Sequence, residues 1–196
     1  MSPDLFIALT GFAFVTSATP GPNNLMLMAS GANYGFRRTV PHMLGVVIGF
    51  TVMVALVGVG LMALFDLFPV AHVVLKYGSI LYLLWLAWRI AHAAAPGTGD
   101  TGRPMTFFEA AAFQWVNPKG WTMALSAIAA YAPDRGLAAA ALVAAVFGLV
   151  NLPSVSAWTA LGQQIRHVLT SAARLRAYNW TMAALLVATL YPVVFA

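Results

Sequence analysis

Two short motifs place helix-breaking residues inside long apolar stretches of this chain. The first reads Pro-Gly-Pro-Asn-Asn at positions 20–24, and the second reads Asn-Pro-Lys-Gly at positions 117–120. Proline has no N–H group and clashes with the preceding helical turn, so each motif leaves backbone carbonyl and amide groups without helical partners. Lipid cannot satisfy such groups, which are tolerated only beside protein or a watery cavity. Two breaks at matched places in the two halves of the chain therefore predict a transport site.

Lys119 is the charged residue that falls nearest the middle of an apolar stretch. A charge at the centre of a bilayer costs on the order of 2.5–3.5 kcal/mol on insertion scales, so we expect Lys119 to face protein or water. No acidic residue is expected at a comparable depth. Two interpretations stay open: Lys119 binds carbonyl groups freed by Pro118 as a structural pin, or it contacts a substrate or a proton.

The first motif also starts a half-helix that continues through Leu25 and Met28. A helix N-terminus attracts anions, so this end of the helix is suited to a substrate carboxylate. Asn23 and Asn24 add neutral donors and acceptors. The alternative is a kink whose polar side chains cap their own helix, and the second break makes that alternative the weaker one.

Other polar residues near the breaks either line a cavity or join helices through amide hydrogen bonds. Gln114 precedes the second break, and Asn151 comes before Pro153 and Ser154 in what we expect to be a polar interruption of the fifth helix. The predicted substrate-binding residues are Pro20, Gly21, Pro22, Asn23, Asn24, Gln114, Asn117, Pro118, Lys119 and Asn151.

Three residues are candidates for coupling transport to protons: Lys119, Asp4 and Glu109. Asp4 and Glu109 stand near expected helix starts, where an acidic side chain also caps the N-terminus, and His42 has a similar position.

The sequence indicates neither a metal site nor an enzyme. His72, His92 and His167 do not have metal-ligand spacing, and there is no cysteine. There is also no phosphate-binding glycine-rich loop and no recognisable serine nucleophile turn. No cofactor is expected.

The composition is that of an integral membrane protein. Apolar residues make up 61% of the chain, charged residues 8%, and the mean hydropathy is +0.83. The formal net charge of +5 does not indicate nucleic-acid binding, because the basic residues lie mostly in short segments between apolar runs. The first apolar stretch is preceded by Asp4 and by no Lys or Arg, which disfavours a secretory signal.

The apolar runs predict an all-α protein of six transmembrane helices, at residues 5–31, 40–64, 71–90, 107–131, 137–161 and 177–195. A hydrophilic linker at residues 93–106 separates a three-helix repeat at 1–92 from a second at 107–196, with the first and fourth helices broken. Because each half has three helices, the second half is inverted in the membrane. Lys and Arg residues concentrate in alternate loops, which places the linker in the cytoplasm and both termini outside.

Four groups of residues resemble the lysine exporter (LysE/RhtB) superfamily of bacterial amino-acid exporters, and the resemblance covers essentially the whole chain. It implies export of amino acids or close derivatives across the bacterial cytoplasmic (inner) membrane, driven by the proton motive force through proton antiport. The residues are Pro20-Gly21-Pro22-Asn23; Gly31, Gly35, Gly45 and Gly49; Asn117-Pro118-Lys119; and Trp158 with Gly162.

One departure from this family bears on the substrate. Exporters of basic amino acids in the family carry an acidic residue just after a glycine of the second helix, where this chain has Phe50 and Thr51. The resemblance therefore implies a neutral, even hydrophobic, amino acid in preference to a dibasic one. Lys119 and the half-helix end near Asn23 are expected to hold its carboxylate while the two inverted halves rock.

Two other functions stay open at this point, a small membrane channel and a membrane scaffold that transports nothing. A channel would show no saturable exchange, and in a scaffold the breaks would serve packing alone. The expected partners are the amino-acid substrate, protons and the lipid bilayer. The chain acts alone or as a homodimer packed through glycine-rich helix faces.

Overall fold

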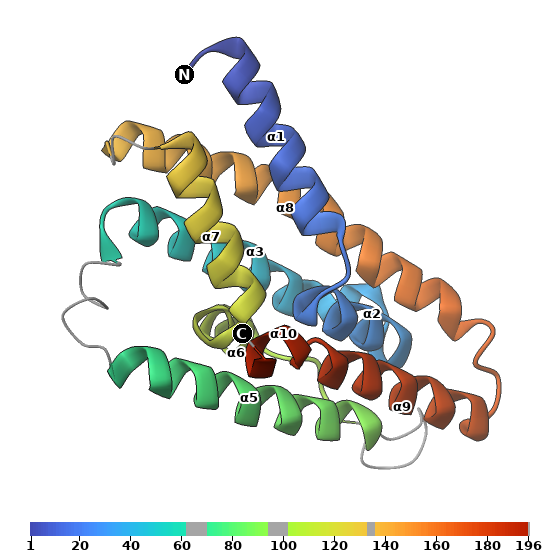
Figure 1. The fold of residues 1–196 in the computed structure, drawn as a ribbon. Coiled ribbons are helices and arrows are strands. Elements are labelled where there is room, and N and C mark those ends of the chain that lie inside the picture. Colours follow the sequence, from blue (N-terminus) through green and yellow to red (C-terminus); the bar gives the residue numbers. More distant parts are fainter. Residues whose placement is uncertain (62–69, 94–101, 133–135, 196) are drawn as a thin grey trace.

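A computed structural model describes residues 1–61, 70–93, 102–132 and 136–195. Within these ranges the chain is helical and has no strand, which confirms the all-α prediction (Figure 1). The helices are α1 (Pro3–Ala18), α2 (Pro22–Tyr34), α3 (Phe36–Gly58), α5 (Val70–Ala91), α6 (Phe107–Phe113), α7 (Pro118–Tyr131), α8 (Leu137–Arg166), α9 (Ala172–Ala188) and α10 (Tyr191–Phe195), with a 3₁₀ turn, η1 (Gln114–Val116).

The first apolar stretch is broken as predicted. Helix α1 ends at Ala18, and α2 leaves it at an angle of 54°. Pro22 is not part of the interruption, because it occupies the first turn of α2, where its missing N–H costs no helical hydrogen bond. Only residues 19–21 are outside both helices, so the gap is shorter than the motif.

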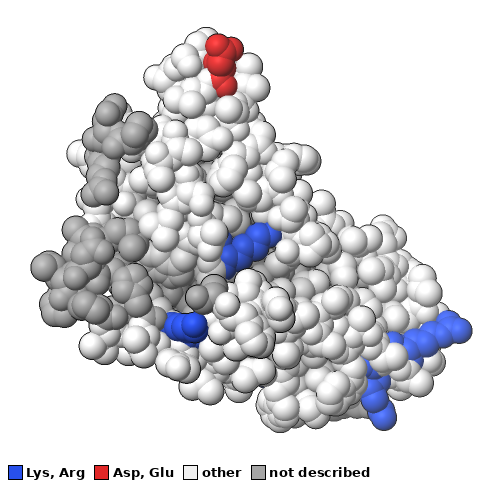
Figure 2. Space-filling model, viewed as in Figure 1, with Lys and Arg blue, Asp and Glu red and all other residues white. Residues whose placement is uncertain are grey.

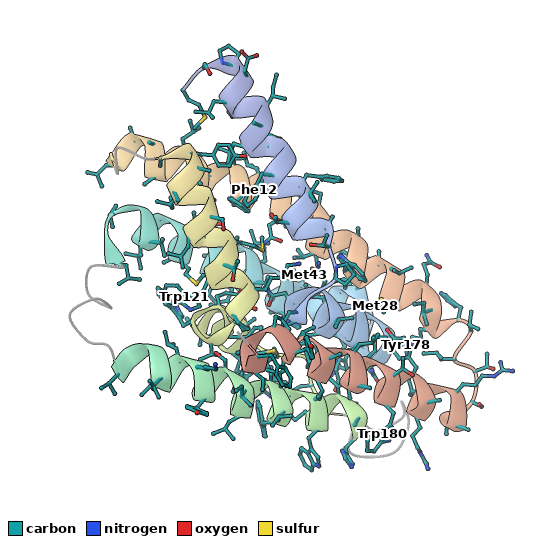
Figure 3. The ribbon with its side chains drawn as sticks, in the orientation of Figure 1. Phe12, Met28, Met43, Trp121, Tyr178 and Trp180 are labelled. Carbon is teal, nitrogen blue, oxygen red and sulfur yellow. The ribbon has the colours of Figure 1, made fainter. Side chains whose placement is uncertain are left out.

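The second break lies slightly earlier than expected. The chain leaves α6 through the 3₁₀ turn η1, and Asn117 has an extended backbone with φ −91° and ψ 104°. Pro118, which was expected to interrupt the helix, instead opens α7 together with Lys119. Trp121 on α7 donates from Nε1 to the carbonyl oxygen of Trp115 at 2.9 Å and so ties α7 back to the turn (Figure 3).

Two other expectations about helices are wrong. The fifth helix was expected to end at residue 161 and to be interrupted near Asn151, but α8 runs without a break through Pro153 to Arg166. A proline is tolerated in a membrane helix when neighbouring groups satisfy the freed backbone, so Pro153 leaves α8 intact. The sixth helix begins at Ala172, after a cap by Ser171, and is interrupted before α10.

Helices of the two predicted halves pack closely against each other. The main contacts are α2 with α8, α3 with α8, α3 with α6, α1 with α8, and α5 with α9. Figure 1 shows α5 and α9 side by side. At Gly31 and Gly162 the backbones of α2 and α8 meet, since a Cβ on either glycine would overlap a carbonyl group of the other helix. Gly45 and Gly49 have a similar role between α3 and α6, since a Cβ on either would overlap the backbone of Phe107 or Ala111.

Among the described residues four helices are long and apolar enough to cross a membrane, and five if the bent pair α1 and α2 counts as one span. The methionine-rich interior, including Met43, lies between these helices (Figure 3). On the face shown in Figure 2, most of the described surface is uncharged, with scattered basic side chains and an acidic one. Residues 62–64 of the predicted second helix and 94–101 of the predicted linker fall outside the described residues.

Candidate functional site

Lys119 reaches from the second break to the first. Its Nζ donates to the carbonyl oxygen of Thr19 at 2.8 Å, to Thr19 Oγ1 at 2.9 Å and to the carbonyl oxygen of Pro20 at 3.4 Å. Its aliphatic stem packs on Gly21, where a Cβ would lie 2.6 Å from Lys119 Cδ. If Lys119 acts as a structural pin, the carbonyl groups that it binds are those of the first motif and not those freed by Pro118.

Three further side chains bind the carbonyl groups at the end of α1. Asn24 Nδ2 donates to Ser17 O at 2.8 Å and to Thr19 O at 2.9 Å. From α8, Ser154 Oγ donates to Ser17 O at 2.9 Å, and Trp158 Nε1 donates to the carbonyl oxygen of Ala18 at 3.2 Å. The carbonyls that the first break frees are thus held by α2, α7 and α8 together.

Asn23 and Gln114 join the two breaks a second time. Asn23 Nδ2 donates to Gln114 Oε1 at 2.9 Å, and Gln114 Nε2 donates to Asn23 Oδ1 at 3.2 Å. Gln114 is fully buried and also donates to the carbonyl oxygen of Ala110 at 2.9 Å. Of the two interpretations of Gln114, the helix-joining one matches this geometry.

The N-termini of the two resumed helices have no side-chain cap. Gly21 precedes α2 and Asn117 precedes α7, and neither supplies a capping hydrogen bond. Because proline fills the first position of each helix, the first backbone N–H groups are those of Asn23 and Asn24 in α2 and of Lys119 and Gly120 in α7. None of the four has an acceptor within the described chain. Each helix end therefore presents two N–H donors and the positive end of the helix dipole.

Both helix ends open onto one small cavity. Two buried polar atoms at this cavity, Ser17 Oγ and Asn117 Oδ1, have no partner in the described structure. Buried polar groups are normally paired, so these atoms point to a bound water or ligand. The lining residues are Thr16, Ser17, Gly21, Pro22, Asn23, Asn24, Phe50, Asn117, Lys119, Gly120, Met123 and Asn151.

Lys119 also borders a wider recess on the other side. This recess lies between the two proline motifs and the interruption before α10, and it is lined by residues such as Pro20, Pro118, Thr122 and Thr189. Figure 2 shows a basic side chain in a hollow near the middle of the visible face. Lys119 therefore separates an inner cavity from a more open space.

The structure brings most of the predicted binding residues to this place. Seven of the ten line the inner cavity. Pro20 and Pro118 line the recess but not the inner cavity, and Gln114 is hydrogen-bonded to Asn23. Asn151 is buried at the cavity and makes no hydrogen bond within the described chain, so its lining role fits better than helix joining.

The structure does not bring Asp4 and Glu109 to the cavity. Asp4 is exposed in the first turn of α1, at the end opposite the break. Glu109 accepts two hydrogen bonds of 2.7 Å from Arg103 and forms a capping box with Thr106. This pairing raises the pKa of the Arg103 guanidinium. Their predicted proton-coupling role stays a prediction.

Thr16, Phe50 and Met123 line the cavity but were not predicted to bind. Ser154 and Trp158 were not predicted either, although both hold the end of α1. One signal was available: Asn151, Ser154 and Trp158 are spaced three and four residues apart, which puts them on one face of α8. Among the described residues no group of His, Asp or Glu side chains is arranged to hold a metal ion.

Apolar helices of membrane-spanning length, together with two breaks that meet at a polar cavity, are typical of membrane transport proteins. The comparisons with known proteins agree. A family profile described as "LysE type translocator" matches residues 14–189, so the chain belongs to the LysE type translocator family.

Several curated relatives carry the name "Cysteine/O-acetylserine efflux protein". Those of Escherichia coli (strain K12) and Shigella sonnei (strain Ss046) are each 32% identical to this chain over 119 residues, which is 61% of this chain and 61% of the relative. The relative of Shigella flexneri serotype 5b (strain 8401) has the same identity and coverage. The chain thus matches less than two thirds of the length of these proteins. No solved structure matches it significantly.

Proposed function

We propose that the protein exports a small neutral amino acid, or a close derivative of one, across the bacterial cytoplasmic membrane. The observation that carries this proposal is the convergence of two uncapped helix N-termini on one cavity. Four free N–H groups and two helix dipoles favour an anionic group, and the α-carboxylate of an amino acid has that chemistry. Broken helices whose ends face a substrate at mid-membrane are a recurring feature of secondary transporters.

Lys119 supplies the positive charge at this carboxylate subsite. Lys119 lines the cavity, and its Nζ donates to the Thr19 carbonyl oxygen, the Thr19 hydroxyl oxygen and the Pro20 carbonyl oxygen. An ammonium group has three donors, so a carboxylate takes over at least one of these hydrogen bonds. An arriving carboxylate competes with Thr19 for Lys119. Substrate binding is in this way linked to the contact between the two breaks.

The rest of the cavity suits a compact neutral substrate. Ser17 Oγ, Asn117 Oδ1 and the Asn151 amide offer acceptors for the substrate ammonium group, and Phe50 and Met123 give an apolar wall. No carboxylate lines the cavity within the described chain, so a second ammonium group would lack a counter-charge. The name of the relatives, which refers to cysteine and O-acetylserine, supports a substrate of this size.

The transport cycle we propose is alternating access coupled to proton antiport. Six membrane helices form two inverted repeats, with both termini outside the cytoplasm. The contacts of α1 with α8 and of α6 with α3 support this arrangement, because each broken helix then packs on the long second helix of the other repeat. Lys119 is the proton carrier that we favour, since it is the ionisable side chain at the cavity among the described residues.

Efflux of labelled amino acids from proteoliposomes, with and without an imposed pH gradient, tests the proposal. Lys119→Met is compared with Lys76→Met, because Lys76 is the other lysine of the chain and lies on α5 away from the cavity. We expect saturable, gradient-dependent efflux of neutral amino acids from the wild type and the Lys76 variant. Efflux should fall at least about tenfold in Lys119→Met.

Three outcomes contradict parts of this proposal. No efflux from well-inserted wild-type protein excludes an exporter and favours a scaffold. Unsaturable flux favours a channel. Normal efflux by Lys119→Met removes Lys119 from the substrate site.

A further inference from the structure

A second cavity lies at the other end of α2. It is enclosed by α2, α3, α5 and the segment that precedes α6. Its lining combines polar and basic groups with apolar side chains. The lining residues used below are His42, Arg89, Arg103 and Ala93, the last for its carbonyl oxygen, together with Met26 and Ile90.

His42 shows that this cavity is suited to a polar ligand. The side chain is 2% exposed, and neither ring nitrogen has a hydrogen-bond partner in the described structure. Two orphaned nitrogens on one buried ring are unusual, since buried polar atoms are normally bonded to protein, water or a ligand. Because His42 lines the cavity, a molecule in the cavity can bond to it.

Arg89 makes the cavity electropositive. Its guanidinium lies 4.9 Å from the centre of the Trp85 ring, and within the described chain it has no carboxylate partner. Arg103 also faces the cavity but is paired with Glu109 at 2.7 Å. Among the described residues nothing neutralises the Arg89 charge, and stacking on Trp85 holds the guanidinium, whose planar shape suits a carboxylate.

We propose that this cavity is a loading site on the cytoplasmic side, which binds the zwitterionic head of an amino acid before it moves to the cavity between the breaks. The carboxylate pairs with Arg89, and the ammonium group donates to the His42 ring or to the carbonyl oxygen of Ala93. The apolar part of the substrate packs against Met26 and Ile90. This inference rests on the proposed export of amino acids.

The position of the cavity supports this order of binding. Arg89, in the last turn of α5, and Arg103, before α6, lie on the side that the charge distribution assigns to the cytoplasm. Helix α2 is a shared wall, with Asn23 at the inner cavity and Ser30 at the second one. At a rise of about 1.5 Å per residue, these two residues are about 10 Å apart along the helix axis. A substrate would travel that distance along α2.

The test measures efflux kinetics in proteoliposomes of known protein orientation, with Arg89→Gln and with Arg37→Gln as the matched control. Arg37 is exposed, belongs to the same predicted side and does not line the cavity. We expect Arg89→Gln to raise the KM for substrate on the cytoplasmic side about tenfold, as for the loss of one charge-assisted hydrogen bond. The maximal rate and the KM from the opposite side should stay near the wild-type values.

A binding measurement separates the two cavities. In detergent, Lys119→Met should still bind a labelled neutral amino acid weakly, and the added Arg89→Gln substitution should abolish that binding. A KM for Arg89→Gln equal to that of the Arg37 control overturns the loading site but leaves the proposed export intact. Absence of efflux from the wild type instead removes the proposed function itself.

The head group of an anionic lipid has chemistry similar to that of a carboxylate, so a separate experiment distinguishes a lipid from an amino acid as the occupant. The kinetics are repeated in vesicles of phosphatidylcholine alone and in vesicles that contain phosphatidylglycerol. An Arg89 effect of equal size in both supports an amino acid as the occupant. An effect confined to phosphatidylglycerol vesicles overturns the proposal, because the cavity then binds lipid.

Discussion

Lys119 and Thr19 are 100 residues apart in the sequence, and two hydrogen bonds from one ammonium group join them, to the Thr19 carbonyl oxygen at 2.8 Å and to its hydroxyl oxygen at 2.9 Å. This contact connects the first turn of α7 to the end of α1. It makes one site out of two sequence motifs, since neither break alone encloses the cavity.

Thr19→Val tests how far this contact is structural. The substitution removes the hydroxyl acceptor and keeps the carbonyl acceptor, so one of three Lys119 hydrogen bonds is lost. We expect a loss of stability of about 1 kcal/mol or less, with the KM for efflux changed less than about threefold. Thermal unfolding in detergent and efflux kinetics measure these effects. A loss of transport as large as that of Lys119→Met would mean that the contact between Lys119 and Thr19 is itself essential for transport.

The paired amides of Asn23 and Gln114 predict strong coupling in a double-mutant cycle. Gln114→Leu leaves the Asn23 amide without its partner and should cost about 1–3 kcal/mol of stability. Adding Asn23→Leu should recover part of that loss, because no amide then remains unpaired. Unfolding of the two single variants and the double variant gives the coupling energy. Additive losses would show that the two amides do not depend on each other.

Gly162→Ala should destabilise the fold, because its Cβ would overlap the carbonyl group of Met28 on α2. We expect a cost of about 1–3 kcal/mol, typical of overpacking. Gly78→Ala is the control, since nothing lies within 4 Å of a Cβ at that position of α5. The yield of monodisperse protein and its thermal midpoint report the difference. Equal behaviour of the two variants would contradict the close crossing of α2 and α8.

Asn151→Asp should change the choice of substrate. A carboxylate at this buried cavity position supplies the counter-charge that a second substrate ammonium group needs. We expect efflux of a dibasic amino acid to appear and the KM for neutral amino acids to rise about tenfold. Asn151→Leu separates loss of the amide from gain of the charge. If neither variant alters selectivity, Asn151 does not face the substrate.

Glu109→Gln should leave proton coupling intact. Glu109 is engaged by Arg103 and Thr106, and glutamine can serve in the same capping box. We expect the dependence of efflux on the pH gradient to change less than about twofold, in contrast to Lys119→Met. Loss of that dependence in Glu109→Gln would make Glu109 the proton carrier. Asp4→Asn provides a parallel measurement in the first turn of α1.

The sequence predicted the breaks because proline acts locally. Pro20, Pro22 and Pro118 restrict the backbone wherever they occur, so the gaps before α2 and α7 could be placed within a few residues. The target of Lys119 could not be predicted, since it depends on the packing of α7 against α1. The same is true of Ser154, which satisfies a carbonyl group 137 residues away. The interruption predicted near Pro153 is wrong, because whether α8 continues through a proline depends on the groups that pack against it.

The glycine contacts described above also determine which helices can move. A glycine seam in which backbone meets backbone has no side chain that can rearrange, so helices joined this way move as one body. Such seams connect α2 to α8 through Gly31 and Gly162, and α3 to α6 through Gly45 and Gly49, so each seam joins helices of both sequence halves. Where α3 meets α8, a Cβ on Gly58 or Gly148 would instead lie nearest to the side chains of Ala140 and Thr51. We therefore expect α2 to move together with α8, and α3 together with α6, while Lys119 couples α7 to α1.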